Sequence, residues 1–392
     1  MRKGWEYKKL GEVCDVINGY AFKSSKYTSQ GTRIIRITNV QKGYVVDNDP
    51  KFYSDEDFKD LFQYSLFEGD LVMSLTGNVG RVGILQKNML PAALNQRVAC
   101  LRVKSKKMQL NYLFHLLNSN LFENAAIQSA RGIAQLNMST EWLKNYIIPL
   151  PPLSTQLAIV SELDKINELI RLKKEQLKDF DNLAQSLFYE MFGDPVENEK
   201  GWEVKKIGDL ALVKTGPFGS MLHKEDYICD GIPLVNPVHM KDFKIVPDLD
   251  FTISKEKASE LENYLLKSND VVFARRGDIG RCAIVSEAEQ GFICGTGSLF
   301  VRFSKEIESI FIMYIIRCDS FSKHLISKAK GATMLNINSN TIADLRIPLP
   351  PLSLQRLFAQ RIEQIEREKS EVQKSIQDLE TLLASRMQYW FE

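Results

Sequence analysis

Two long stretches of the chain carry apolar residues at alternating steps of four and three, which is the spacing of one face of a coiled-coil helix. Each stretch follows a Pro-Pro pair and a serine that suits a helix N-cap, Ser154 or Ser353. The pattern predicts two helices that pair antiparallel, the first about 57 Å long at about 1.5 Å per residue. The apolar positions are Ile159, Leu163, Ile166, Ile170, Leu177, Phe180, Ala184 and Leu187 in the first stretch, and Phe358, Ile362, Ile365, Val372, Ile376, Leu379 and Leu383 in the second.

The segments before these helices have a different pattern. Short β-branched runs such as RIIRITNV and GDLVMSL alternate with Gly and Asn turns, and an amphipathic helical stretch follows in each segment. They predict compact α/β heads with a small, mostly antiparallel sheet, so the fold class of the whole chain is α+β. The predicted parts are a head at 1–152, a helix at 153–192, a linker and second head at 193–351, and a second helix at 352–392.

Four segments recur in the same order, at separations between 197 and 200 positions. Such repetition indicates a tandem duplication of about half the chain. The two predicted helices are then equivalent, and each is the natural partner of the other across a pseudo-twofold axis. The matching pairs are GWEYKK and GWEVKK (4–9, 201–206), the segments 69–85 and 269–285, RGIAQLN and KGATMLN (131–137, 330–336), and IPLPPLSTQ and IPLPPLSLQ (148–156, 347–355).

Composition excludes several classes of protein. Lysine plus arginine number 51 against 49 acids, and a formal net charge of +2 is not that of a histone-like polycation. No run of eighteen apolar residues marks a membrane span, and MRKGWEYKKLGEV lacks the apolar core of a signal peptide, so we expect a cytoplasmic protein. The six cysteines form no Cys-x-x-Cys pair and the four histidines are dispersed, which predicts buried reduced thiols and no metal site.

The motifs of common enzyme classes are missing from the sequence. It contains no GxxxxGK[ST] loop, no GxGxxG after a strand, no GxSxG elbow and no HExxH pair. We therefore predict no catalytic residue and no cofactor in this chain.

A duplicated Gly-x-x-Gly-Arg motif, at 77–81 and 277–281, is the best remaining polar feature. The glycines are interpreted as a turn joining two strands, and each arginine then lies where it could reach a phosphate or a guanine edge.

The local charge of the first head supports a polyanionic partner, whereas that of the second head does not. Residues 1–150 hold 20 basic against 13 acidic side chains, whereas 201–350 hold 19 of each.

Together these pieces resemble the specificity (S) subunit of type I restriction–modification systems, over essentially the whole chain. The resemblance rests on the W-x-x-K-x-[LI]-G-[ED] openings at 5–12 and 202–209, the G-D-[LV]-[LV] segments that lead into Gly-x-[VI]-Gly-Arg, and the PLPPLSxQ starts of both helices. One departure is Asn269, where the first copy has Gly69.

The resemblance implies that each head is a target-recognition domain for double-stranded DNA and that the chain itself is a non-catalytic subunit. The helices would dock two modification (methyltransferase) subunits, and two restriction subunits would join through them. The complex would methylate adenine and cleave DNA with ATP, with S-adenosylmethionine, ATP and Mg bound on the partner subunits. Because the two heads differ in sequence, we predict two different half-sites separated by an unread gap, in contrast to the palindromic site of a homodimer.

Candidate DNA contacts are polar or cationic residues in predicted turns, since Asn and Gln suit adenine edges and Arg suits guanine or phosphate. Any single one of them could equally be a solvated turn residue. The candidates are Lys23, Ser24, Ser25, Arg36, Thr38, Asn39, Arg81, Asn95, Gln96, Arg97 and Arg131 in the first head, and Ser220, Asn236, His239, Arg275, Arg276, Arg281, Thr296, Ser298 and Lys330 in the second.

Apolar residues off the coiled-coil seam are candidate partner contacts: Leu169, Leu172, Leu183 and Phe188. Leu183 and Phe188 could instead widen the core. The C-terminal Tyr389-Trp390-Phe391 cluster either packs on the first head or anchors a partner.

Two other functions remain open at this level. One is a self-sufficient DNA-binding regulator, which would bind its site tightly without a methyltransferase partner. The other is a scaffold whose heads bind protein. Salt dependence separates this second alternative, because phosphate contacts make log affinity fall linearly with log salt.

Overall fold

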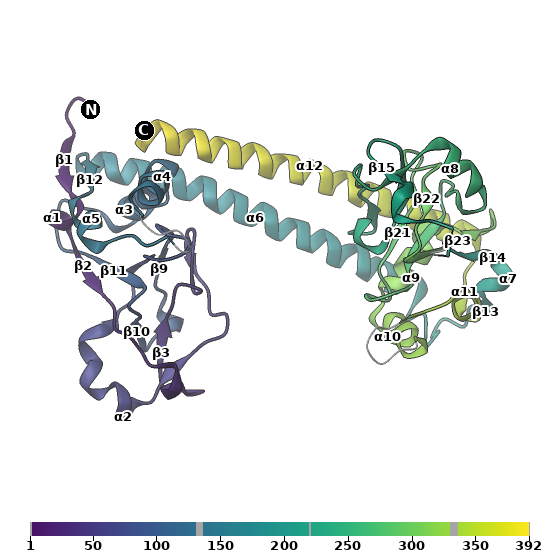
Figure 1. Cartoon of the computed structure of the whole chain (residues 1–392), viewed down its shortest axis with the longest axis horizontal. Coiled ribbons are helices and arrows are strands. Elements are labelled where there is room, and N and C mark those ends of the chain that lie inside the picture. Colours follow the sequence, from purple (N-terminus) through teal and green to yellow (C-terminus); the bar gives the residue numbers. More distant parts are fainter. Residues whose placement is uncertain (1, 131–135, 219–220, 330–335, 392) are drawn as a thin grey trace. The chain divides into compact units, whose positions relative to one another are not determined.

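The computed structural model describes residues 2–130, 136–218, 221–329 and 336–391. The chain divides into two compact units, residues 1–174 with 374–392, and residues 175–373. Each unit holds one head and part of both long helices, α6 (Leu153–Phe192) and α12 (Leu352–Phe391) (Figure 1). The first unit is therefore assembled from two separate stretches of sequence.

The first head contains two four-stranded sheets, in the strand orders β6-β3-β10-β7 and β2-β11-β8-β9, and two shorter ladders, β1-β12 and β4-β5. Neighbouring strands run antiparallel except for the parallel pair β3 and β10. The elements are β1 (Glu6–Lys9), α1 (Leu10–Val13), β2 (Cys14–Asn18), η1 (Ser24–Lys26), β3 (Thr32–Ile35), β4 (Val40–Gln41), β5 (Tyr44–Val45), β6 (Phe52–Tyr53), α2 (Asp55–Phe58), η2 (Lys59–Tyr64), β7 (Ser65–Leu66), β8 (Leu71–Ser74), β9 (Val82–Ile84), η3 (Lys87–Met89), β10 (Ala92–Leu94), β11 (Val98–Val103), α3 (Leu110–Leu117), α4 (Asn120–Ser129), α5 (Thr140–Asn145) and β12 (Ile147–Leu150).

The second head repeats this arrangement, with the sheets β15-β19-β16-β22 and β14-β23-β20-β21 and the ladders β13-β24 and β17-β18. Here β16 and β22 form the parallel pair. The prediction of duplicated, mostly antiparallel α+β heads is confirmed, but each head holds two four-stranded sheets where one small sheet was predicted. The elements are β13 (Glu203–Lys206), α7 (Ile207–Leu210), β14 (Ala211–Thr215), η4 (Lys224–Asp226), β15 (Tyr227–Ile228), β16 (Ile232–Val235), η5 (Pro237–His239), β17 (Met240–Lys241), β18 (Lys244–Ile245), β19 (Thr252–Ile253), α8 (Lys255–Glu260), η6 (Glu262–Tyr264), β20 (Val271–Ala274), β21 (Cys282–Ile284), β22 (Ile293–Cys294), β23 (Ser298–Phe303), α9 (Ser309–Arg317), α10 (Asp319–Lys328), α11 (Ser339–Ala343) and β24 (Arg346–Leu349).

The central strands are apolar at successive positions because both faces of their sheet are covered. Successive side chains of a strand point to opposite faces. In β8, Leu71 and Met73 join the core formed with α3 and the start of α6, whereas Val72 joins a second core with Ile35 and Leu94 of the other sheet. The continuous apolar runs of the sequence therefore mark a sheet packed between two cores.

The long helices pair antiparallel within each unit. In the first unit Lys174 of α6 lies 2.7 Å from Glu380 of α12, and Glu162 bonds Arg386. In the second unit Asp181 lies 2.8 Å from Lys369. Along these pairs the residue number on α12 falls as the residue number on α6 rises, which confirms the predicted antiparallel orientation. Buried seam positions include Ile159, Leu163, Ile166, Ile170 and Ala184 on α6, and Phe358, Ile362, Ile365, Val372 and Ile376 on α12.

The glutamine of each PLPPLSxQ motif ties the start of a long helix to its head. Gln156 is fully buried and donates 2.8 Å hydrogen bonds to the carbonyls of Lys107 and Pro151, while its own side-chain oxygen accepts the Gln109 N–H. Gln355 repeats the arrangement in the second unit. A buried backbone group needs a hydrogen-bond partner, so this glutamine fixes the junction. Both copies of the motif carry this glutamine, but its role at the junction was not predicted from the sequence.

The aspartate of each Gly/Asn-Asp motif forms an ion pair in which the carboxylate is buried and the arginine is partly exposed. Asp70 and Asp270, 4% and 1% exposed, are held by Arg102 and Arg302 through two hydrogen bonds each, at 2.8 and 2.6 Å. Each carboxylate also accepts a backbone N–H, from Phe67 or Lys267. These duplicated acids therefore hold the turn that precedes β8 and β20.

We predict that His115 makes the stability of the first unit sensitive to acid. Its side chain is buried, with Nε2 2.7 Å from Asp164 Oδ1, and burial lowers the pKa of His115 although Asp164 opposes the shift. A histidine whose folded-state pKa is depressed stabilises the fold above its unfolded pKa, about 6.5, and that stability is lost as pH falls below it. In urea unfolding from pH 7.5 to 5.5, His115→Gln should lose less stability than the wild type. The exposed His223→Gln should follow the wild type, and equal pH dependence of His115→Gln and wild type would contradict the prediction.

Candidate nucleic-acid interface

The parallel strand pair of each head brings predicted contact residues to one edge. Parallel strands end at the same edge of a sheet, and Arg36–Asn39 follow β3 while Asn95–Arg97 follow β10. The Asn95 N–H donates to the Ile35 carbonyl at 3.2 Å, which joins the two turns. In the second head the Gly295 N–H donates to the Val235 carbonyl in the same way, at 3.0 Å. We call this edge the recognition edge.

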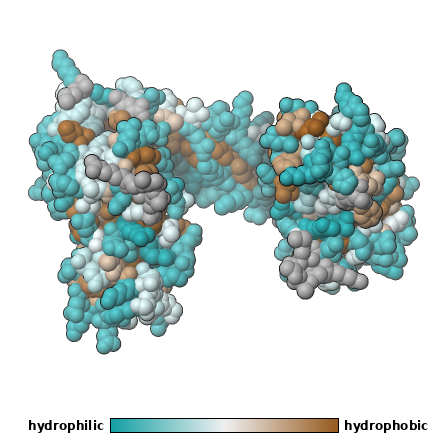
Figure 2. All heavy atoms as spheres, viewed as in Figure 1, coloured by the Kyte–Doolittle hydropathy of each residue, from teal (hydrophilic) through white to brown (hydrophobic). Residues whose placement is uncertain are grey.

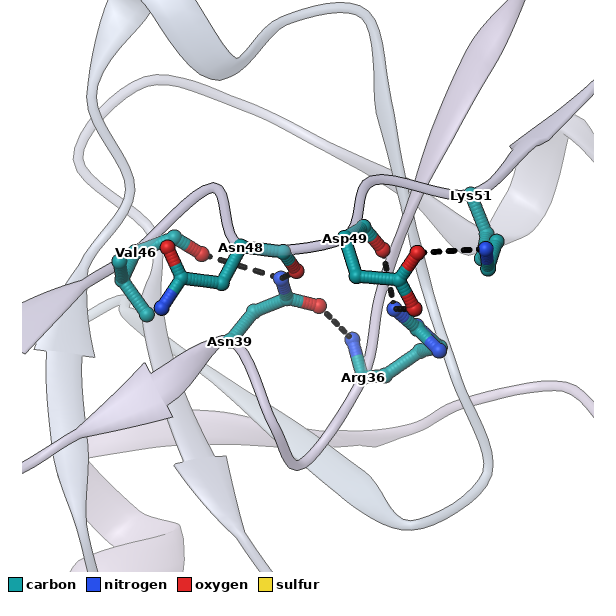
Figure 3. A network of polar contacts seen from close by, with 6 residues as sticks. All are labelled: Arg36, Asn39, Val46, Asn48, Asp49 and Lys51. Carbon is teal, nitrogen blue, oxygen red and sulfur yellow. Dashed lines mark hydrogen bonds and ion pairs between the residues drawn. The ribbon is translucent and has the colours of Figure 1, made fainter. Parts of the chain in front are cut away.

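A polar network holds the recognition edge of the first head (Figure 3). The Asn39 side-chain oxygen accepts the Arg36 N–H at 3.0 Å, and its amide donates to the Val46 carbonyl at 3.0 Å. The Arg36 guanidinium donates to the Asp49 carbonyl at 2.5 Å, and Lys51 donates to the Asp49 carboxylate at 2.6 Å. The bond from Lys51 and the weaker one from Arg36 hold the pKa of Asp49 below its ordinary value.

Three predicted contacts are wrong, because their side chains are buried inside the head. Asn39 and His239 are 2% and 6% exposed, and Ser298 is fully buried. Asn39 spans the turn described above, and His239 Nδ1 accepts the Asn236 N–H at 3.2 Å in the equivalent turn. The Asn39 and His239 side chains close their own turns, and the Ser298 hydroxyl is buried without a hydrogen-bond partner among the described residues, so none of the three is exposed to a base.

The duplicated Gly-x-x-Gly-Arg motif forms the turn between β8 and β9 and between β20 and β21, which confirms the prediction for its glycines. Gly77 and Gly80 have φ of 75° and 81°, a region that favours glycine. Arg81 donates to Gln41 Oε1 at 2.9 Å, and Arg281 donates to the Pro237 carbonyl at 3.3 Å. Arg81 therefore reaches β4 and Arg281 reaches η5, the elements that follow the parallel strand in each head.

The other candidates differ in accessibility. Arg131, Ser220 and Lys330 lie outside the described residues. Exposed candidates are Lys23, Ser24, Ser25, Thr38, Gln96, Arg97, Arg276 and Arg281, and half-buried ones are Arg36, Arg81, Asn95, Asn236, Arg275 and Thr296.

Arg275 is the candidate whose surroundings most favour an anion. Burial lowers the pKa of Arg275, and the adjacent Arg276 adds to this effect. Its Nε is buried without a hydrogen-bond partner among the described residues. A phosphate next to this half-buried guanidinium would supply the missing negative charge.

The apolar surface of the long helices is the candidate partner site. Figure 2 shows apolar side chains interrupting the hydrophilic surface there. Leu169, Leu172 and Leu183 are 47%, 46% and 52% exposed, so they are available to a partner. The prediction for Phe188 is wrong, because this ring is fully buried against Phe192 and Phe358 in the second unit.

The C-terminal aromatic cluster packs within the first unit. Phe391 is buried against Tyr112 of the head, and the indole N–H of Trp390 donates to Glu162 at 2.9 Å. The Arg2 guanidinium lies over the rings of Tyr389 and Trp390, at 4.9 and 5.6 Å. Of the two interpretations of this cluster, packing on the first head is the one that the structure shows.

Across 2–130, 136–218, 221–329 and 336–391 no three His, Cys, Asp or Glu side chains gather as a metal site. The helices within these ranges include none that is long and apolar enough to span a membrane. Cys229 corrects the prediction that every thiol is buried, because it is exposed; the other five cysteines are buried and free.

Comparison with known proteins gives a consistent result. The family model described as Type I restriction modification DNA specificity domain matches twice, at residues 2–179 and 199–381. The EcoBI specificity subunit of Escherichia coli is 22% identical over 400 residues, covering 95% of this chain and 81% of that protein. The putative MjaX specificity subunit of Methanocaldococcus jannaschii is 25% identical over 425 residues, covering 97% and 92%.

Two solved structures share the fold. A chain from work on assembly and conformational transition of the type I R-M system has a TM-score of 0.65 at 20% identity, covering 100% of this chain and 98% of that one. The type I S subunit from M. genitalium has a TM-score of 0.54 at 14% identity, covering 98% and 95%.

Proposed function

We propose that each head of this chain, which belongs to the type I restriction modification DNA specificity family, reads one half of a bipartite, asymmetric DNA target. The observation that carries the proposal is the recognition edge, which both heads build on the same parallel strand pair but fill with different side chains. Arg36 and Thr38 of the first head correspond to Asn236 and Val238 of the second. Different side chains match different base edges, so the two half-sites differ.

The proposal extends to two modification subunits, one docked on each half of the chain. Identical partners need the same surface twice, and the duplication identifies such a surface. Leu183 corresponds to Leu382 at the same position of the second long helix, and the two are 52% and 45% exposed. By contrast, Leu169 and Leu172 correspond to Glu368 and Glu371, which favours Leu183 and Leu382 as the common contact.

The chain would then supply specificity, and its partners would supply catalysis. S-adenosylmethionine would bind on the modification subunits, which methylate adenine, and ATP and Mg on two restriction subunits that join through them. The six cysteines, of which five are buried and free, suit the reducing cytoplasm that the proposal assumes.

The test is co-expression with the neighbouring methyltransferase gene product, followed by mass determination of the complex and sequencing of its methylated DNA. We expect one copy of this chain with two methyltransferase subunits, and methyladenine in a gapped, non-palindromic motif. A palindromic motif would contradict the asymmetric target.

The same material separates the alternatives. A chain that stays alone, binds a site tightly and directs no methylation is the regulator. If the affinity of the complex for DNA does not change with salt, this chain is the protein-binding scaffold, because every phosphate contact adds to the salt dependence.

A further inference from the structure

The duplication allows the two heads to be compared position by position. The comparison separates residues that hold the fold, which we call framework residues, from surface residues that vary. Framework residues are the same in both copies: Asp70 and Asp270 hold their turns, and Gln156 and Gln355 hold the helices. The side chains of the recognition edge, by contrast, differ in polarity between the two heads. The inference drawn from this difference rests on the proposed function.

In the second head the recognition edge is apolar where the first head is polar. Thr38, Asp49 and Lys51 of the first head correspond to the apolar residues Val238, Leu249 and Phe251. The equivalence is structural, because Val46 and Val246 each donate to the same residue of the turn, Asn39 or His239, at 2.8 Å. The three apolar side chains are 66%, 54% and 53% exposed.

Val238 and Phe251 line one hollow of about 540 Å³ on the second head. Tyr227 backs it, with its ring 6.0 Å from that of Phe251, and Asn236 lies on the same lining. The fully charged side chains of the lining are Lys224 and Asp248, one of each sign. The hollow therefore has little net attraction for phosphate and is suited to apolar contact with an uncharged group.

An exposed apolar cluster of this kind usually marks a contact surface. A partner that docks identically on both halves would require the same residues in both heads, and here they are opposite in character. What differs between the halves of the proposed assembly is the base sequence that each head reads. The cluster therefore belongs to the surface that faces the bases.

We propose that Val238, with Phe251 beside it, contacts the 5-methyl groups of thymines in the half-site read by the second head. The thymine methyl is the apolar group that the major groove presents, and an aliphatic side chain recognises it without a hydrogen bond. In the first head the same position is Thr38, beside Arg36 and Lys51, so that head reads its half-site by polar contacts instead.

The test replaces each thymine of the methylated motif by deoxyuridine, which removes only the methyl group. Affinity of the complex with its methyltransferase partner is measured for each oligonucleotide. We expect sensitive thymines in one half-site only, each losing about fourfold, the equivalent of about 0.8 kcal/mol for one methyl-sized group. Val238→Ser should bind the thymine target more weakly and should not distinguish thymine from deoxyuridine at those positions.

Val204→Ser is the matched control, because Val204 is exposed on β13 of the same unit and does not line the hollow. It should keep the wild-type response to deoxyuridine. A complex that methylates a gapped motif but tolerates deoxyuridine everywhere would overturn the thymine contact and leave the proposed function intact. Loss of the methyltransferase subunit from the Val238→Ser complex would overturn the thymine contact, because Val238 would then contact protein. A chain that directs no methylation would instead refute the proposed function.

Discussion

Replacing both Leu183 and Leu382 by aspartate is expected to remove the two methyltransferase subunits from the proposed complex, and either single substitution is expected to remove one of them. Each leucine is exposed on a long helix at the same repeat position. A carboxylate in an apolar contact must be desolvated without a partner, which costs several kcal/mol and therefore more than a hundredfold in affinity. The complex mass should fall from two partner subunits to one in each single variant and to none in the double variant.

Leu169→Asp provides the matched control. Leu169 is 47% exposed against 52% for Leu183, and its counterpart Glu368 shows that an acid is accepted at this position of the other long helix. This variant should keep both partner subunits and full methylation. A double Leu183→Asp, Leu382→Asp variant that still carries two partner subunits would place the docking surface elsewhere.

Replacing Asp270 by alanine is expected to destabilise the chain by about 1–3 kcal/mol, because the partly exposed Arg302 and a backbone N–H both lose their acceptor. Asp270 is 1% exposed and accepts two hydrogen bonds from Arg302 and one from the Lys267 N–H. Without it Arg302, whose side chain is 27% exposed, keeps its hydrogen bond to the Leu265 carbonyl but loses its acid partner. Denaturant unfolding of the full chain should show an earlier transition.

Two further variants separate the ion pair from general damage to the chain. Asp278→Ala removes an exposed acid that pairs with Arg281 at 2.9 Å, and its cost should stay below about 1 kcal/mol, as for surface pairs. Asp270→Ala combined with Arg302→Met should recover part of the lost stability, because the unpaired charge is then gone. A loss below about 1 kcal/mol for Asp270→Ala alone would show that the pair is dispensable.

The sequence alone predicted the candidate site only in part, and the reasons are specific. It correctly placed the Gly-x-x-Gly turns, because glycine at positive φ leaves a local signature. It assigned Asn39, His239 and Ser298 to DNA because their chemistry suits bases, but all three are buried. Whether a polar side chain serves its own turn or a ligand depends on the direction in which the backbone aims it, and residue type does not encode that direction.

Partner contacts show the same limit. Leu183 and Phe188 are both apolar, lie five positions apart on α6 and are equally plausible as core or surface. The structure exposes Leu183 and buries Phe188 among aromatic rings of α6, α9 and α12. Leu382 was not among the predicted contacts, although its position in the repeat matches that of Leu183.

By itself the sequence determined the duplication, the two heads, the two antiparallel helices and the family, because periodicity and repeated motifs are properties of the chain order. Only the tertiary structure decided which residues share the recognition edge. That edge is formed where two parallel strands end together, β3 with β10 and β16 with β22, from segments about 60 residues apart in the sequence. Pairing over such a separation is set by how the sheets and cores pack as a whole, and no local pattern records it.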